Sequence, residues 1–479
     1  MPTLHPEEST LYSSVADRVA GLIDKGTLRP GQKVPSVRKL SAQLDVSIST
    51  VLQAYRLLED RGRIEARPQS GYYVRGPLAP PPAEPRVLTC RHAPCKVSVM
   101  DVVARLLTFS NAPGTINLGG ALPGEAGMPT QQLNRLSAAI ARRTKRGNNT
   151  YDLPPGCPEL RAQVARRYVD AGCALAPDDI LTTCGCQEAL NLCVRAVARA
   201  GDAIAIESPT FYGHLQTIET LGMRALEIPT SPRDGISIEA LGDALVRQRG
   251  KIRAVVVISN CQNPLGSVMP EERKRELVRL LARHEVPLIE DDIYGDLAFD
   301  RARPGLCKSH DAEGNVLLCS SFSKTLAPGA RVGWCAPGKY LRDVLRLKIG
   351  STLATPTLPQ LAIAQFLATG HYEHHLRKTR ALYAHQVQQV SAAVQRYFPA
   401  GTRVTRPAGG FVVWVELPEG TDAMALHEKA IARGISVAPG PIFSAKGKFE
   451  NFIRLNCSCS WTPELERALM TVGELAGEG

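Results

Sequence analysis

The stretch VLLCSSFSKTLAPGARVGW, residues 316–334, sets the architecture of the large C-terminal part of this chain. An apolar run gives way to serines and to Lys324, as happens where a buried strand ends in a polar loop. Amphipathic stretches on the order of ten residues or more separate it from similar apolar runs before it. These runs are DAIAIE (202–207), AVVVIS (254–259) and VPLIED (286–291). Continuous apolar strands between helices predict an α/β fold with a mostly parallel sheet.

Polar residues follow the last of these runs, at the end of the sheet where ligands bind. Lys324 has Ser321 and Ser323 before it and Arg331 seven residues after it. This arrangement suits pyridoxal phosphate, because Lys324 would form the Schiff base while the serines and Arg331 hold the phosphate. Desolvation and nearby positive charge must then lower the pKa of the lysine. Taken alone the pattern is weak, because a lysine among serines usually belongs to a surface loop.

Further motifs around this lysine occur in the order of a known family. Residues 110–475 resemble the fold-type I aminotransferases, the aspartate aminotransferase superfamily, through IEDDIYGDL, SNCQNPLG, TCGCQEAL, ESPTFYGH, TYDLPPGCPELR and FIRLNCS. The resemblance implies a transferase fold with a smaller C-terminal subdomain. It also implies that Asp291 pairs with the pyridine nitrogen of the cofactor and keeps the ring electron-withdrawing. Tyr294 and Asn263 would hydrogen-bond the 3-oxygen of the ring.

The same resemblance assigns residues to the cofactor phosphate. Gly185, Cys186 and Gln187 open a helix, where free amides and the helix dipole favour a dianion. Tyr151 matches a tyrosine that relatives lend to the phosphate of the neighbouring subunit.

The ring face and the substrate are assigned in the same way. Phe211 matches the aromatic residue that stacks on the cofactor ring, and Arg454 matches the arginine that clamps the substrate α-carboxylate. Taken singly, each residue has another explanation: Asp291 suits a solvated strand end, Phe211 suits a core position, and Arg454 suits a structural ion pair. The order in which the motifs occur together favours the cofactor site. Ala121 stands where relatives usually have glycine near the substrate.

The first residues of the chain have a different, mainly helical pattern. A helical spacing of apolar residues ends near Gly26, a short helix opens at Pro35-Ser36, and Ser47 or Ser49 suits the cap of a third helix. The string RIEARPQSGYYV then alternates and turns at Ser70-Gly71, which predicts a two-stranded ribbon. Three helices and a ribbon outline a winged helix-turn-helix.

Residues 30–74 resemble the winged-helix domain of GntR-type bacterial regulators, and residues 29–75 carry nine Lys/Arg against four Asp/Glu. Hydroxyls and amides at a helix N-terminus meet DNA phosphates and base edges. On this basis Ser47, Ser49 and Thr50 are predicted DNA contacts. The resemblance to the family implies that Arg38 and the wing-tip Gly71 also contact DNA, with Arg67 as a minor-groove or phosphate partner. Ile48 stands where relatives often have arginine, so bidentate guanine readout must come from elsewhere. A small helical interaction domain is the alternative.

A proline-rich break separates the two patterns. RGPLAPPPAEPRVLTCRHAPC, residues 75–95, holds six prolines and cannot sustain a helix or a central strand. A chain of 479 residues also exceeds what one hydrophobic core usually supports. We therefore expect a DNA-binding domain at 1–76, a semi-rigid linker at 77–109 and an aminotransferase-like domain at 110–479.

Composition narrows the class of protein. The net charge of +11 permits a polyanionic partner without showing one, and 44% hydrophobic residues argue against wholesale disorder. No apolar run approaches the roughly 18–20 residues of a membrane span, and the first ten residues do not suit a secretory signal. The 13 cysteines are scattered without zinc-type spacing, which predicts reduced, mostly buried thiols in a cytoplasmic protein and no metal site.

A winged helix joined through a proline-rich linker to an aminotransferase-like domain resembles the MocR subgroup of GntR regulators, over residues 10–475. The resemblance implies a transcriptional regulator of double-stranded DNA, a head-to-tail homodimer, and a domain that senses pyridoxal phosphate or an amino compound. An aminotransferase acting on an amino acid, with Lys324 as general base and an appended DNA-binding domain, stays open, so enzymatic activity is undecided. A scaffold without cofactor is the third class.

Overall fold

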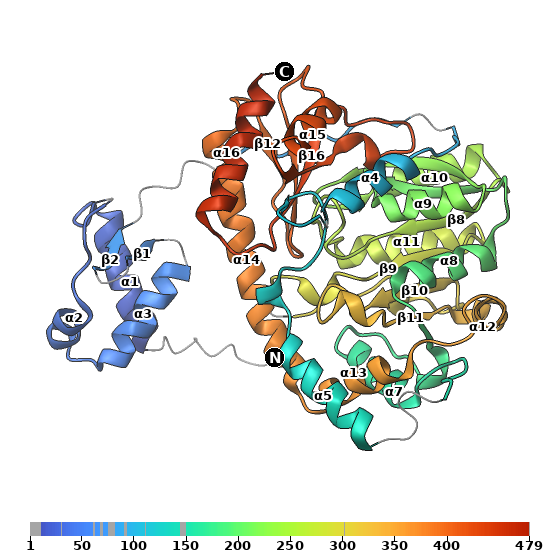
Figure 1. Ribbon diagram of the computed structural model, residues 1–479, viewed down its shortest axis with the longest axis horizontal. Helices are drawn as coiled ribbons and strands as arrows, with labels where there is room; N and C mark the ends of the chain where they lie inside the picture. The colour runs from blue at the N-terminus through green and yellow to red at the C-terminus, as the bar shows by residue number, and fades with distance from the viewer. Residues whose placement is uncertain are drawn as a thin grey trace, which may run out of the picture. The chain divides into compact units, whose positions relative to one another are not determined.

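The computed structural model of the chain divides into two compact units, Met1–Pro81 and Pro82–Gly479 (Figure 1). The structure describes residues 11–29, 31–60, 63–67, 70–74, 82–90, 93–110, 112–143, 150–300 and 302–478. The boundary falls inside the linker predicted for residues 77–109. Residues from Pro82 onward belong to the large unit, and α4 (Met100–Ser110) is a helix with Val103 and Leu106 buried. The prolines that suggested a linker end at Pro94, and the helical spacing of the apolar residues after them forms α4.

The small unit is a three-helix body with a ribbon. Its elements are α1 (Leu11–Asp24), α2 (Val37–Leu44), α3 (Ile48–Asp60), β1 (Ile64–Arg67) and β2 (Gly71–Val74), with the two strands antiparallel. This order confirms the predicted winged helix-turn-helix.

The packing of the small unit depends on α3. Val51, Tyr55 and Leu58 of this helix are buried against the other elements. The Tyr55 hydroxyl donates a hydrogen bond of 2.6 Å to the carbonyl of Pro35, which ties α3 to the start of α2. Ser36 caps α2 by accepting the Lys39 N–H.

The large unit is built on an eight-stranded sheet with the order β4-β11-β10-β9-β8-β5-β6-β7. The strands are β4 (Leu181–Thr183), β5 (Ala203–Ser208), β6 (Arg224–Ser231), β7 (Gly235–Ile236), β8 (Ile252–Val257), β9 (Leu288–Asp291), β10 (Val316–Ser321) and β11 (Gly333–Ala336). The pairs from β10 to β6 are parallel, whereas β11 and β7 run against their neighbours. The four apolar runs identified in the sequence lie in β5, β8, β9 and β10, which confirms the mostly parallel sheet.

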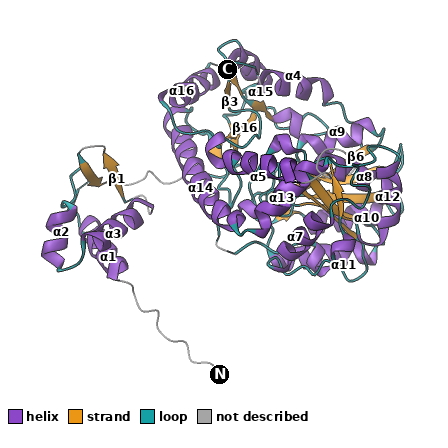
Figure 2. Ribbon diagram, turned by 60° about the horizontal axis from the view of Figure 1, so that its bottom comes forward, coloured by secondary structure: helices purple, strands orange, loops and turns teal. Residues whose placement is uncertain are grey.

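Helices cover both faces of this sheet (Figures 1 and 2). Ile204 and Ile206 of β5 pack into one hydrophobic cluster and Ala205, between them, into another, as the two-residue period of a strand requires. The helices of this part are α7 (Pro158–Val169), α8 (Cys186–Val197), α9 (Tyr212–Thr220), α10 (Ile238–Arg247), α11 (Glu271–Arg283), α12 (Leu341–Ile349) and α13 (Thr357–Ala368). A strand order of this kind brings the ends of β8, β9 and β10 to one edge.

The last part of the chain forms a smaller subdomain. Its antiparallel sheet has the order β12-β13-β16-β15, and β14 pairs in parallel with β3. The elements are β3 (Ile116–Asn117), β12 (Arg403–Val404), β13 (Val412–Glu416), β14 (Ile435–Ser436), β15 (Ala438–Pro439), β16 (Phe452–Asn456), α14 (His371–Tyr397), α15 (Ala423–Ile431) and α16 (Pro463–Gly477). The long α14 joins two cores, because Tyr383 packs with the large sheet and Val390 with the subdomain.

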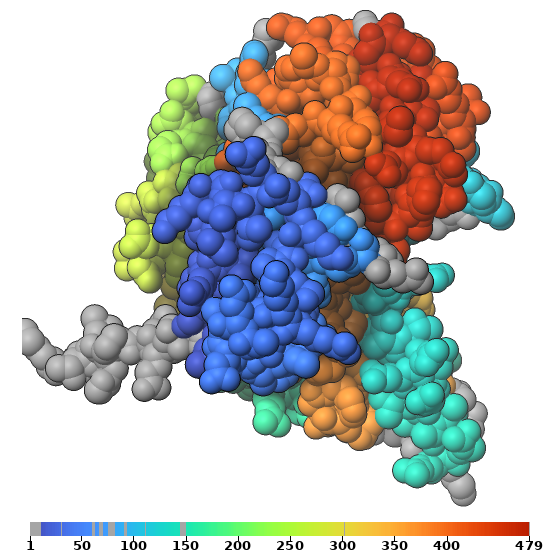
Figure 3. Space-filling view, turned by 90° about the vertical axis from the view of Figure 1, so that its left-hand side faces the viewer, coloured from blue at the N-terminus to red at the C-terminus, as the bar shows by residue number. Residues whose placement is uncertain are grey.

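The surface of the large unit includes one outlying helix, α5 (Thr130–Arg143). Leu133 is its buried residue, and Figure 3 shows the helix in cyan as a ridge. Within the described part of the chain, no helix is both long and apolar enough to cross a membrane. No group of three or more metal-ligating side chains is found among the same residues. All 13 cysteines are free thiols, most of them buried.

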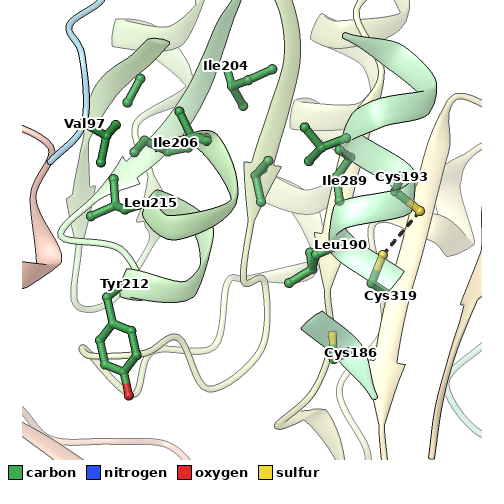
Figure 4. Close-up of a cluster of buried hydrophobic side chains, with 14 of the residues drawn as sticks. Val97, Cys186, Leu190, Cys193, Ile204, Ile206, Tyr212, Leu215, Ile289 and Cys319 are labelled. Atoms are coloured by element: carbon green, nitrogen blue, oxygen red, sulfur yellow. Dashed lines mark hydrogen bonds between the residues drawn. The ribbon is translucent and has the colours of Figure 1, made fainter. Parts of the chain in front are cut away.

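Leu190 of α8 belongs to the buried cluster drawn in Figure 4. Its side chain is 2% exposed. We expect Leu190→Ala to lower the free energy of unfolding of the large unit by about 2–5 kcal/mol, because it leaves a cavity under the sheet. Urea unfolding followed by tryptophan fluorescence measures this unit, since all three tryptophans belong to it. Val169→Ala, at a 66% exposed position of α7, is the control and should change the value by less than about 0.5 kcal/mol. Equal losses would contradict the packing.

Candidate functional site

Lys324 lies in the loop that follows β10, and its side chain is partly buried. Its Nζ donates a hydrogen bond of 2.6 Å to the carbonyl of Ala121 and lies 6.0 Å from the centroid of the Tyr294 ring. Burial and then the positive charge of Arg454 lower the pKa of Lys324 to about 8. The lysine therefore has the property that its predicted role requires, an amine that loses its proton near neutral pH.

Asp291 ends β9 and is buried beside the lysine loop. One carboxylate oxygen accepts the Ile293 N–H at 3.1 Å and the Cys186 thiol at 3.4 Å. The other lies 3.2 Å from Nε2 of His214, whose Nδ1 is 3.2 Å from the Thr210 hydroxyl. These contacts fix the carboxylate. His214 was missed in the sequence, although it stands three residues after Phe211 in a quoted motif.

The N-terminus of α8 and the end of the lysine loop meet at one point. Gly185 precedes the helix with φ of 85°, a conformation that favours glycine. The Arg331 guanidinium donates a hydrogen bond of 2.8 Å to the Cys184 carbonyl, and a Cβ on Gly185 would lie 2.5 Å from that guanidinium. Free helix amides and an arginine thus converge where the sequence predicts the phosphate.

The side chains of Cys186 and Gln187, two further residues predicted to bind the phosphate, are hydrogen-bonded within the protein. The Cys186 side chain faces Asp291, and the Gln187 amide donates to the Gly213 carbonyl at 3.1 Å and to the Thr217 hydroxyl at 2.8 Å. Only their backbone amides are left for an anion at the helix end. Ser321 at the end of β10 and Ser323 in the lysine loop are both buried, and the Ser323 N–H donates to the Ser321 hydroxyl at 3.2 Å.

Arg454, on β16, is fully buried. It donates to the Asn263 side-chain oxygen at 3.0 Å and to the Gly119 carbonyl, while its Nε has no partner among the described residues. The Asn263 side chain also lies beside Tyr294, whose pKa is raised by burial. Arg454, Asn263 and Tyr294 therefore form one cluster, and the sequence motifs that carry them lie far apart along the chain.

Phe211 and Tyr151 differ in their placement. Phe211 precedes α9 and its ring centroid lies 5.8 Å from that of His214, so it belongs to the Asp291 neighbourhood. Tyr151 is 75% exposed and lies outside the cluster of its own chain. Its role at the phosphate of a neighbouring subunit stays a prediction.

The chemistry of these residues fits pyridoxal phosphate. The cluster offers a lysine of lowered pKa, a buried carboxylate and a glycine cradle beneath Arg331. The buried Nε of Arg454 is a further donor without a partner in the described residues. A bound anion at Arg454 would satisfy that donor, because buried guanidinium groups require acceptors.

The residues predicted to contact DNA lie around the second and third helices of the small unit. Arg38 is exposed on α2. The Ser47 hydroxyl accepts the Thr50 N–H at 3.1 Å and lies 2.7 Å from the Ser49 hydroxyl, so Ser47, rather than Ser49, caps α3. Gly71 starts β2 with φ of 103°. The side chain of Arg67 lies outside the described residues.

Two protein families match the chain. The family described as aminotransferase class I and II matches residues 116–472, and the family described as bacterial regulatory proteins, gntR family, matches residues 11–74. The first match spans the Lys324 loop and the sheets of the large unit, and the second spans the helices and the ribbon of the small unit.

Individual proteins are similar to all or most of this chain. An uncharacterized HTH-type transcriptional regulator, YjiR of Escherichia coli (strain K12), is 38% identical over 97% of this chain and 98% of its own length. The probable rhizopine catabolism regulatory protein MocR of Rhizobium meliloti is 26% identical over 90% of this chain and 86% of its own. Among solved structures, LysN, the α-aminoadipate aminotransferase from Thermus thermophilus complexed with N-(5'-phosphopyridoxyl)-L-leucine, has a TM-score of 0.71 at 28% identity, over 80% of this chain and 99% of that one.

The lowered pKa of Lys324 leads to a direct expectation. The neutral amine, the form that attacks an aldehyde, should increase as pH rises through about 8, whereas an exposed lysine titrates near about 10.4. The rate of covalent attachment of pyridoxal phosphate to cofactor-free protein, followed by absorbance, should rise with pH and level off above about 8. Arg454→Met removes a positive charge and should move that midpoint upward. A wild-type midpoint near that of an exposed lysine would contradict the described environment.

Proposed function

We propose that this chain, which belongs to the HTH-type transcriptional regulators that join a gntR-family domain to an aminotransferase class I and II domain, binds operator DNA through α2 and α3. In this proposal the large unit senses pyridoxal phosphate, or an amino compound held with it. The observation that carries the proposal is the joint presence of a capped helix-turn-helix and a lysine–carboxylate–arginine cluster in one chain.

DNA binding uses the exposed part of the small unit. Arg38 on α2 supplies a charge for a phosphate, and the N-terminus of α3 presents Ser49 and Thr50 beside the capping Ser47. Ile48 is 50% exposed at the same helix end, where an apolar side chain suits contact with a thymine methyl group.

Sensing uses the residues around Lys324. Pyridoxal phosphate, when bound, supplies an aldehyde and an electron-withdrawing pyridine ring. Lys324, whose pKa is lowered to about 8, would present its amine to the aldehyde, and Asp291, held by His214 and Cys186, would pair with the ring nitrogen. Arg331 and the amides of α8 neutralise the phosphate, and Arg454 receives a carboxylate.

A second copy of the chain completes the assembly in this proposal. Tyr151 is 75% exposed and Leu153, two positions later in the chain, is 58% exposed. Exposed apolar residues grouped in this way suit an interface. A head-to-tail homodimer places Tyr151 at the phosphate of its partner and gives the assembly two DNA-binding units.

The second candidate function is transamination of an amino acid. The lowered pKa of Lys324 favours it, because the same amine serves as a general base once it is released. Sensing and turnover require the same groups, so the distinction rests on whether product is formed and leaves.

Operator binding tests the proposal. We expect pyridoxal phosphate to change the affinity of the full-length protein for selected DNA by about 5- to 150-fold, the usual range of coupling between two sites. The DNA is a duplex selected by the protein from a random-sequence pool, and affinity is measured by fluorescence anisotropy at fixed salt.

Two variants serve as controls in this measurement. Lys324→Ala should bind DNA without responding to the cofactor, whereas Arg38→Ala should bind DNA more weakly in both conditions with the ratio retained. Equal DNA affinities with and without cofactor, together with multiple turnovers of amino donor and keto acid, would contradict the proposed regulator and favour the aminotransferase.

A further inference from the structure

The first described segment of the large unit, residues 82–90, lies along the smaller C-terminal subdomain; we refer to it as the strap. The Val404 N–H of β12 donates a hydrogen bond of 3.0 Å to the Ala83 carbonyl. The Arg406 guanidinium donates to the Pro82 carbonyl at 3.2 Å. The strap therefore begins with its backbone bonded to the edge of the β12–β13 sheet.

A second attachment lies on β13. The Arg86 N–H donates to Oε2 of Glu416 at 2.9 Å, and its guanidinium is 3.7 Å from Oε1. The Glu416 side chain is only 11% exposed, whereas that of Arg86 is 63% exposed. Because exposed ion pairs contribute little, the bond from the amide to the shielded carboxylate accounts for most of this attachment.

The strap also bonds to the large sheet. Glu84 forms an ion pair of 2.8 Å with Arg233, in the turn between β6 and β7. Lys448, in the C-terminal subdomain, donates to the Thr89 carbonyl at 3.2 Å. The strap thus contacts both the C-terminal subdomain, which carries Arg454, and the part built on the large sheet, which carries Asp291.

The underside of the strap is closely packed. Pro85 is buried, and the strap encloses a cavity of about 10 Å³ together with Pro209, Leu265 and Trp414. A space of this size holds one water molecule at most. Since so little free volume remains, a shift of the elements below requires the strap to shift as well.

The three residues beneath the strap adjoin the candidate site. Pro209 precedes Phe211 by two positions, Leu265 follows Asn263 by two positions, and Trp414 is the register partner of Arg454 in the β13–β16 pair. The strap therefore rests on the segments that also carry Phe211, Asn263 and Arg454, the residues proposed for the ring face, the 3-oxygen and the substrate carboxylate.

We propose that the strap transmits the ligand state of the site to the DNA-binding unit. Residues 75–81 are all that join β2 to the strap, so the seating of Pro82–Arg86 on β12 and β13 sets where the tether to that unit begins. Ligand contacts with Phe211, Asn263 and Arg454 order the elements below and strengthen the seating. This inference rests on the function proposed above, and it assigns the route of regulation.

Hydrogen exchange of the full-length protein tests the strap without reference to DNA. Peptides covering residues 82–90 should exchange more slowly, by about fivefold or more, when pyridoxal phosphate is added, the lower end of usual coupling between sites. Unchanged exchange in this segment, with cofactor binding verified by absorbance, would overturn the proposal whatever the DNA-binding result.

Substitutions then test the transmission. Glu416→Ala removes the acceptor of the Arg86 amide, Glu416→Gln keeps an oxygen there, and Pro85→Gly loosens the strap without altering β13. Glu428→Ala is the matched control, because Glu428 forms an exposed pair with Arg105 away from the strap. All four should bind pyridoxal phosphate within about twofold of the wild type, the scatter expected outside a site.

The cofactor-induced change in DNA affinity separates the outcomes. It should fall to less than about twofold in Glu416→Ala and Pro85→Gly, below the usual range of coupling, and be largely retained in Glu416→Gln and Glu428→Ala. Full response in both strap variants would overturn the proposal. If the cofactor slows hydrogen exchange in the strap but does not change the DNA affinity of the wild type, the proposed function is contradicted. The strap is then still a segment that responds to the ligand.

Discussion

The parallel pairing of β9 with β10 is the constraint on which the candidate site depends. Its register places Asp291 opposite Cys319, so the chain leaves both strands at the same edge of the sheet. Asp291 and the Lys324 loop follow from that one arrangement. Arg331 precedes β11, whose antiparallel pairing with β4 places Gly333 opposite Thr183 and so sets Arg331 beside the N-terminus of α8. Burial of this region lowers the pKa of the lysine.

Much of this arrangement could be predicted from the sequence. The run VLLCSS coincides with β10, and the winged helix-turn-helix has the predicted order, because apolar periodicity and capping residues act locally. Contacts between distant segments were not predictable in the same way. The thiol of Cys186 turns to Asp291, and the linker predicted up to residue 109 includes α4. Both results depend on packing partners that lie far away in the chain.

Regulation in this account requires that a small ligand alter a protein surface it does not touch. The C-terminal subdomain meets this requirement through the paired strands β13 and β16. Arg454 lies on β16, and Glu416 of β13 accepts the Arg86 amide of the strap. The short tether to the DNA-binding unit starts from that strap. Transamination needs the same ring-binding residues but makes no use of such an attachment.

Thermodynamic linkage provides the most direct measurement of the central claim, that one chain couples DNA binding to a cofactor site. The affinity for pyridoxal phosphate is measured by absorbance titration with and without saturating selected DNA. The account predicts that DNA changes the cofactor affinity by the same factor by which the cofactor changes the DNA affinity, because coupling free energies are reciprocal. Identical cofactor affinities in the two titrations would contradict it.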